Sequence, residues 1–333
     1  MDKRRFEEID IARGLAILLV YLGHSFLYYP IKLATMYKWC DVSTSAISSF
    51  HMPLFFIISG YLFAYSQRSS FDIFKNKVLK LFIPYSTVMI ILILPKLFLP
   101  STLIYRKVSG LGNFLSDSFL YGYDRWFVYV LFLMFILMIS TRKLLNNKLY
   151  CCIVLLLSVG LATFINLPRI FSINKIIYYS FFFLFGFIAK DYYSVVFDKM
   201  KNNIYLKTGL YILFILCNIV FVKILLPTAL IGKYILPLIG AVATITLSHS
   251  LSNMKTASDN ITIRYIKYAG KYSLQFYLLT FAFPIIRHVV INILHIVNPF
   301  MIVSIIFIMQ LICITIIVEV TKRIKFLKIP LGY

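Results

Sequence analysis

The feature that most constrains this chain is a series of apolar segments, each close to the length that crosses a lipid bilayer. Of its 333 residues, 61% are hydrophobic, whereas soluble domains are about 45–50% apolar. A membrane-spanning α-helix needs about 20 predominantly apolar residues. We identify ten such segments, at approximately residues 9–28, 44–66, 81–99, 126–140, 150–166, 174–191, 203–222, 234–252, 270–291 and 299–320. The sequence therefore predicts an all-α integral membrane protein, a bundle of about ten transmembrane helices.

The basic residues orient this bundle. If the N-terminus is cytoplasmic, the inside segments hold 22 Lys and Arg residues and the outside segments hold 11. Cytoplasmic loops carry an excess of such residues, so we expect both termini to be cytoplasmic and the protein to lie in the cell (plasma or inner) membrane as a multi-pass protein. The net charge of +22 has the same explanation, and we expect membrane lipids rather than nucleic acid as partners.

The ends of the chain and its cysteines predict no soluble domain and no metal site. The basic start leads into a span interrupted by charge, without a small-residue cleavage site, so the first span is expected to remain as a signal anchor. Because neither end resembles a soluble domain, residues 1–333 are expected to form a single transmembrane domain. The five cysteines show no metal-binding spacing, and no metal is expected.

The first apolar segment contains two polar residues that are costly inside a membrane, Arg13 and His24. An ionisable residue in a span is a candidate functional residue. The 11 positions from Arg13 to His24 turn a helix by about 1100°, so both side chains lie on one face, separated by a rise of about 16 Å. Arg13 is then near the cytoplasmic surface and His24 in the outer half. Asp10 can pair with Arg13; alternatively, the two only neutralise each other, and His24 is a buried, hydrogen-bonded histidine.

The second segment carries a histidine at a similar predicted depth. His51 is followed by Pro53, which can kink or start a helix, and by Ser59 and Gly60, which permit close helix approach. Two imidazoles on consecutive helices could face one cavity, and histidine is suited to general-base catalysis near neutral pH. The first two spans are therefore the candidate site.

These motifs resemble those of the membrane acyltransferase-3 family. Asp10, Arg13-Gly14 and His24 have the spacing of that family's first helix, and residues 50–61 are similar to the Phe-His-Met-Pro-Leu-Phe-Phe…Ser-Gly-Tyr pattern of its second. Further matches follow in order at Lys80–Tyr85, Arg125–Phe127 and Gly270–Leu278. The resemblance covers about residues 5–290 and is closest to sugar O-acetylases of the fucose 4-O-acetylase type. The family often has a histidine where this chain has Leu279-Thr280, so no role is carried over for it.

The resemblance implies transfer of an acyl group, usually acetyl from acetyl-CoA, to a hydroxyl of a carbohydrate or glycolipid. A guanidinium suits phosphate, so Arg13, with Asp10 beside it and Lys77 or Lys80 helping, is expected to bind CoA. His24 would deprotonate the acceptor hydroxyl or carry the acyl group briefly, and His51 would be its partner or stabilise developing charge. The candidates for acceptor binding are Arg125, Trp126, Ser59 and Tyr277.

Other interpretations of the sequence stay open. Buried charges and broken helices are also features of transporters and flippases, although transporters commonly show paired halves and the unusual residues here lie in the first two spans. The acceptor could also be an amino acid, a peptide or a lipid. Trp126 has an alternative role as an interfacial belt residue. His249, His288 and His295 are expected to be solvated or interfacial, and Glu319 is expected to pair with Lys322 and Arg323.

Overall fold

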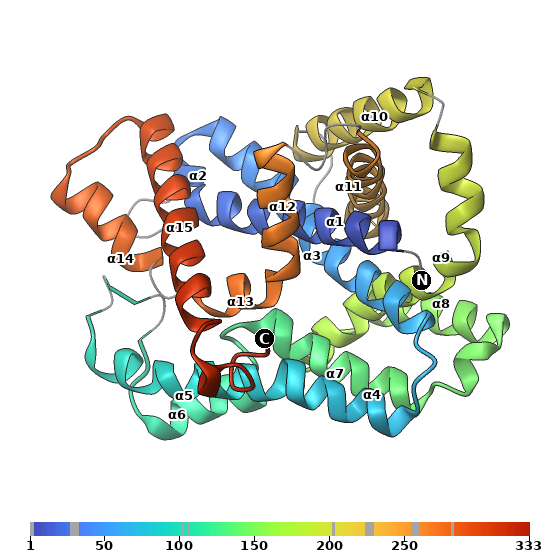
Figure 1. Ribbon diagram of the computed structural model, residues 1–333, viewed down its shortest axis with the longest axis horizontal. Helices are drawn as coiled ribbons and strands as arrows, with labels where there is room; N and C mark the ends of the chain where they lie inside the picture. The colour runs from blue at the N-terminus through green and yellow to red at the C-terminus, as the bar shows by residue number, and fades with distance from the viewer. Residues whose placement is uncertain are drawn as a thin grey trace. The chain divides into compact units, whose positions relative to one another are not determined.

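The computed structural model describes residues 3–26, 33–100, 103–104, 107–201, 204–223, 230–254, 260–280 and 283–333 (Figure 1). Every regular element in these ranges is helical, which confirms the predicted all-α class. The helices are α1 (Lys3–Phe26), α2 (Leu33–Met36), α3 (Lys38–Ala64), α4 (Ser70–Lys77), α5 (Ile83–Phe98), α6 (Leu111–Leu115), α7 (Trp126–Ser140), α8 (Lys148–Phe164), α9 (Ile173–Lys201), α10 (Ile204–Lys223), α11 (Leu236–Ser252), α12 (Ile261–Lys271), α13 (Ser273–Leu278), α14 (Phe283–His288) and α15 (Pro299–Thr321). Short π-helical or 3-10 turns join several of them, including Val78–Phe82, which links α4 to α5.

Six helical stretches in the described residues are long and apolar enough to cross a membrane, which makes this a multi-pass membrane protein. They are Glu7–Phe26, Lys38–Ala64, Ser70–Phe98, Ile170–Tyr192, Gly232–Ser252 and Pro299–Thr321, and each coincides with a predicted segment. Shorter apolar helices at Trp126–Ser140, Lys148–Phe164, Tyr205–Leu216 and Phe283–Ile293 fall in the remaining four predicted segments. Ten crossings and two cytoplasmic termini stay predictions, and residues 27–28, 203 and 281–282 of the predicted segments lie outside the described residues.

The segment predicted as one helix over residues 270–291 is interrupted. Helix α12 ends at Lys271, α13 occupies only Ser273–Leu278, and a further helix starts at Phe283. Tyr272 leaves the helical conformation, with φ of −104° and ψ of 22°. The predicted segment rests on hydropathy averaged over about 20 residues, and such an average does not register the polar residues Lys271 and Ser273 on either side of Tyr272.

The described chain forms two compact units, each built from separate stretches of sequence. Unit 1 contains α1, α2, α3, α10, α11, α12 and the part of α9 from Tyr179 onward. Unit 2 contains α4 to α8, the start of α9, and α13 to α15. The single transmembrane domain over residues 1–333 stays a prediction.

In unit 1, α1 packs against α3, α11 and α12, and Figure 1 shows α12 crossing α1. Glycines permit this crossing: a Cβ atom on Gly270 would lie 1.7 Å from the carbonyl oxygen of Asp10, and one on Gly14 would lie 2.0 Å from that of Ile266. Close backbone approach at small residues is how helices pack in a membrane. The contact with α12 therefore requires glycine at position 14, which the sequence identified only as part of a motif.

Helix α3 crosses α9 in the same manner. A Cβ atom on Gly60 would lie 1.8 Å from the carbonyl oxygen of Phe183, and one on Gly186 would lie 2.0 Å from that of Ile57. The predicted close approach at Gly60 is therefore confirmed. Pro53 lies inside α3 and does not begin the helix.

In unit 2, α5 and α7 supply the aromatic core, and the C-terminal segment packs back onto α13. The buried rings of Tyr85 in α5 and Tyr129 in α7 lie 5.7 Å apart, and the amide of Gln275 donates to the carbonyl oxygen of Leu331 over 3.0 Å. At the end of α15, Glu319 pairs with Lys322 and lies 3.9 Å from Arg323, as the sequence predicted.

Candidate functional site

The predicted site residues divide between the two units. Arg13, Asp10, His24, His51 and Ser59 belong to unit 1, and Lys77, Lys80, Arg125, Trp126 and Tyr277 belong to unit 2.

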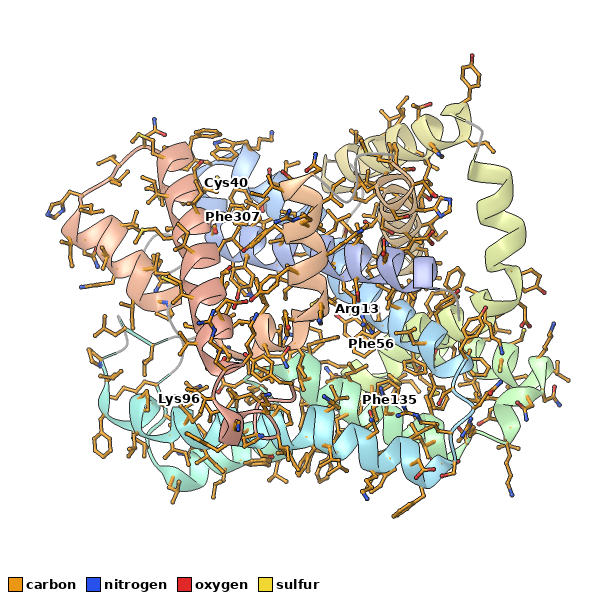
Figure 2. All side chains as sticks on the ribbon, viewed as in Figure 1. Arg13, Cys40, Phe56, Lys96, Phe135 and Phe307 are labelled. Atoms are coloured by element: carbon orange, nitrogen blue, oxygen red, sulfur yellow. The ribbon has the colours of Figure 1, made fainter. Side chains whose placement is uncertain are left out.

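Arg13 and His24, here called the α1 stripe, are both half-buried on α1 (Figure 2 labels Arg13). At about 100° per residue, Gly14, which meets α12, lies about 100° to one side of Arg13. Gly23 lies about 80° to the other side, and it meets α3, because a Cβ atom there would be 3.3 Å from a side-chain methyl of Ile47. The α1 stripe is therefore directed between the faces that meet α3 and α12.

Two ion pairs fix the start of α1 in this rotation. The Glu8 Oε1 atom lies 2.9 Å from Nδ1 of His249 in α11, and the Nζ atom of Lys267 in α12 donates to Glu7 Oε2 over 2.9 Å. Glu8 is only 6% exposed. Since Glu8 lies about 140° around the helix from Arg13, it holds α1 from the side away from the stripe.

His249, which the sequence suggested to be solvated or interfacial, is largely buried. Its side chain is 14% exposed, and it forms the ion pair with Glu8 described above. The two residues are 241 positions apart, and no local pattern connects them. A histidine near the end of an apolar helix gives the same sequence signal whether it faces water or a buried carboxylate.

The packing of α12 also brings cations to the Arg13 end of the α1 stripe. The carboxylate of Asp10 interacts electrostatically with Arg13, as the sequence predicted, and also with Lys267 and Lys271 of α12. In the sequence, Lys271 is only one residue of a motif. Cations from α12 therefore lie near Asp10, on the same part of α1 as Arg13.

His51 has a defined hydrogen-bonding pattern. Its Nδ1 atom lies 2.6 Å from the carbonyl oxygen of Ile47. Because a carbonyl oxygen only accepts, Nδ1 is the donor, and in a neutral imidazole Nε2 carries the lone pair. Nε2 is thus the atom of His51 that can take a proton from a substrate.

The packing of α3 against α1 determines which part of α1 lies level with His51. Phe26, at the end of α1, contacts Trp39 near the start of α3, with ring centroids 5.9 Å apart, so the two helices are antiparallel. Ile47 is level with Gly23. His51 is one turn, about 6 Å, further along α3. Its level therefore falls within the length of the α1 stripe, and the half-buried Ser59 lies two further turns along α3.

The two lysines predicted to assist CoA binding have other contacts in unit 2. The Lys77 ammonium lies 3.7 Å above the ring centroid of Phe135 (labelled in Figure 2). Lys80 Nζ donates to the carbonyl oxygens of Gly332 over 3.3 Å and of Tyr333 over 2.8 Å. A phosphate ligand would have to join or replace these contacts, and the role of both lysines stays a prediction.

Three of the four acceptor candidates come together in unit 2. Arg125 Nε donates to the carbonyl oxygen of Leu278 over 3.0 Å, and the amide of Phe127 donates to the Tyr277 hydroxyl over 3.2 Å. Trp126 lies between the two residues that make these bonds. The segments are about 150 positions apart, and the break after Leu278 makes its carbonyl oxygen available to Arg125.

A buried ion pair lies beside these residues and was missed in the sequence. Lys96 in α5 (labelled in Figure 2) bonds to Asp124, and their side chains are 5% and 9% exposed. The charge count groups Lys96 with the outside segments, and its burial against Asp124 appears only in the structure. Arg287, counted in the same way, is also buried, at 3% exposure. The sequence does not show whether a charged side chain at the end of an apolar segment is exposed or buried.

Comparison with known proteins identifies the class of protein that carries this site. Residues 6–319 match a family model described as an acyltransferase domain, and this helical protein has six candidate membrane spans among its described residues. The chain belongs to the acyltransferase-3 family. Over 190 residues it is 29% identical to the nodulation protein NolL of Mesorhizobium japonicum, an alignment that covers 54% of this chain and 46% of that protein. No solved structure matches the chain.

Proposed function

We propose that this membrane acyltransferase is an O-acetyltransferase, which moves an acetyl group from acetyl-CoA to a hydroxyl of a cell-surface or exported glycan or glycolipid. The observation that carries the proposal is the α1 stripe: a guanidinium and an imidazole share one face of a membrane span, in a chain of the acyltransferase-3 family. The sugar acceptor is inferred from the resemblance to sugar O-acetylases.

The donor is assigned to the Arg13 end of the stripe. CoA carries several phosphates, and the planar guanidinium of Arg13 is suited to bind them. The electrostatic interaction of Asp10 with Lys271 supports this assignment, because it brings a second cation to the same end, whereas Lys267 is paired with Glu7. About 16 Å of helix separates Arg13 from His24, which leaves room for the extended pantetheine arm between them.

The chemistry is assigned to the two histidines. A neutral imidazole nitrogen of His24 takes the proton of the acceptor hydroxyl while the hydroxyl oxygen attacks the thioester carbonyl carbon. The carbon–sulfur bond then breaks, the acetyl ester forms, and the CoA sulfur receives a proton. In the alternative route His24 carries the acetyl group before the hydroxyl does. The Nε2 atom of His51 assists either route, and the bond of Nδ1 to Ile47 supports this role because it leaves the lone pair on Nε2.

The test measures acetyl transfer directly. Membranes containing the protein should incorporate labelled acetyl from acetyl-CoA into a surface glycan and release free CoA thiol. His24→Ala should abolish both signals at equal protein level, whereas His295→Asn, on an exposed residue with φ of 49° that asparagine tolerates, should retain them. Movement of a glycan precursor without consumption of acetyl-CoA would instead identify a flippase.

The acceptor can be found by comparing surface glycans. NMR spectra of the glycan from cells with and without the gene should differ by an acetyl signal and by a downfield shift of the proton at the esterified carbon. Identical spectra from cells that do consume acetyl-CoA would direct the search to a non-sugar acceptor.

A further inference from the structure

Two loops of unit 2 hold residues in costly backbone conformations. The described residues include four non-glycine positions with positive φ, and three of them lie in these loops: Arg125 at 51°, Phe171 at 50° and Ser172 at 53°. Left-handed backbone is unfavourable for such residues and persists where the surrounding structure enforces it, often at binding sites. The two loops are therefore candidates for a site.

The loops are joined to each other. The Ser172 hydroxyl, on a residue that is 1% exposed, donates to the carbonyl oxygen of Tyr121 over 2.7 Å. The Tyr121 ring in turn stacks on that of Tyr123 at 5.3 Å. On the other side, the hydrogen bonds of Arg125 and Phe127 to α13 hold the first loop in place. These contacts fix the backbone of the two loops, from which the loop side chains project.

In and next to these loops, a group of cations surrounds an indole ring. We call this group the Trp126 cluster; it consists of Arg125, Trp126, Arg169 and Lys175. The Lys175 ammonium lies 4.8 Å from the centroid of the Trp126 ring, and the charge of Arg169 acts on Lys175. Arg169 is exposed, while the other three are half-buried. Like charges repel one another, and a bound anion would offset this repulsion, so such a cluster is a candidate anion-binding site.

The carboxylates of the first loop are fewer than the cations in and beside this cluster. Asp124 is engaged with Lys96, and Asp117 is the other carboxylate of the first loop. With Lys96 included, four cations face two carboxylates, which leaves a local net charge of +2. Arginine and lysine side chains bind carboxylate and phosphate groups, and an aromatic face packs against the apolar face of a sugar ring.

We propose that the Trp126 cluster binds the anionic group, carboxylate or phosphate, of an acidic acceptor sugar. The inference rests on the proposed function, because it assigns to the acceptor side of that reaction a substrate with a negative charge. Arg169 and Lys175 bind the anion, Trp126 packs against the sugar ring, and Arg125 is held by Leu278 beside them. A phosphate could belong to the sugar or to a lipid headgroup, and the experiment separates these sources.

The test uses the small number of tryptophans. The chain has two, so the Trp39→Phe variant of the full-length protein in neutral detergent reports on Trp126 alone. The probes are glucuronate and glucose 1-phosphate, with glucose as the neutral counterpart. Both anionic sugars should change the Trp126 fluorescence saturably, and glucose should not. Adding Arg169→Gln and Lys175→Gln should weaken binding of the anionic sugars at least tenfold.

Control measurements distinguish an acceptor site from a general anion site and from a lipid site. Lys143→Gln, which removes an exposed cation elsewhere in unit 2, should leave the affinities unchanged. Equal affinity for inorganic phosphate, or loss of the sugar signal when phosphatidylglycerol is added, would overturn the proposal in favour of a general anion or lipid site. A fluorescence change that is absent, or that the double substitution leaves intact, would also overturn it. Acetyl-CoA consumption, measured separately, reports on the proposed function itself.

Discussion

The carboxylate of Glu8 in α1 and the imidazole of His249 in α11 are joined at 2.9 Å, although 241 positions separate them. This contact lies on the side of α1 away from Arg13, so it fixes the helix rotation that directs the α1 stripe. The Glu7–Lys267 pair and the glycine crossing hold the same helix against α12. The site in unit 1 thus depends on residues that do not belong to the stripe.

We expect His249→Ala to destabilise the protein by about 3 kcal/mol, because it leaves the buried carboxylate of Glu8 without its partner. His249→Asn, whose amide nitrogen can replace Nδ1 as a donor, should recover most of this loss. Thermal unfolding in detergent measures both. In the assay of acetyl transfer, the alanine variant should also raise KM for acetyl-CoA, since the rotation of Arg13 is no longer fixed. A wild-type melting temperature and KM for the alanine variant would contradict this role.

Gly270→Ala should cost about 1–3 kcal/mol of stability, because the new methyl group would lie 1.7 Å from the carbonyl oxygen of Asp10 and force α12 away from α1. Gly209→Ala is the matched control within unit 1. Nothing lies within 4 Å of a Cβ atom at that position, so alanine should be neutral or add up to about 1 kcal/mol through helix propensity. The fraction of monodisperse protein after a heat step, measured by size-exclusion chromatography, distinguishes the two variants. Similar behaviour of both would count against a close crossing.

A double-mutant cycle tests the buried pair of Lys96 and Asp124. Lys96→Met or Asp124→Asn alone should destabilise by about 3–5 kcal/mol, because each leaves one buried charge unpaired. The double variant removes both charges and should be more stable than either single variant. Free energies of unfolding from denaturant titration give the coupling energy. Additive losses would indicate that the two side chains act independently.

His51→Asn tests the chemical role of His51 without removing its bond to Ile47, because the asparagine amide can donate in place of Nδ1. The variant should fold with an unchanged melting temperature. It should lower kcat for acetyl transfer by about 10²-fold or more, in the range that general acid–base groups contribute. A kcat equal to that of the wild type would remove His51 from the reaction.

Properties that depend on neighbouring residues could be predicted from the sequence. Segment length and hydropathy indicated the all-α class and ten apolar segments, six of which coincide with helical stretches long and apolar enough to cross a membrane. The helical repeat placed Arg13 and His24 on one face of α1. The pairing of Glu319 with the next turn followed from the same repeat. The motifs in the first two spans correctly indicated the acyltransferase-3 family.

The tertiary structure alone decided which helices meet and which charges are buried. Lys96 and His249 have the sequence signal of residues at the ends of apolar segments, yet each is paired with a carboxylate on another element. The helix break at Tyr272 is likewise hidden when hydropathy is averaged over a whole span. It precedes the short helix α13, whose last residue, Leu278, supplies a carbonyl oxygen to Arg125. The physical reason is that periodicity fixes where a side chain lies around its own helix. The partner at that position is set by packing between segments that can be more than a hundred residues apart.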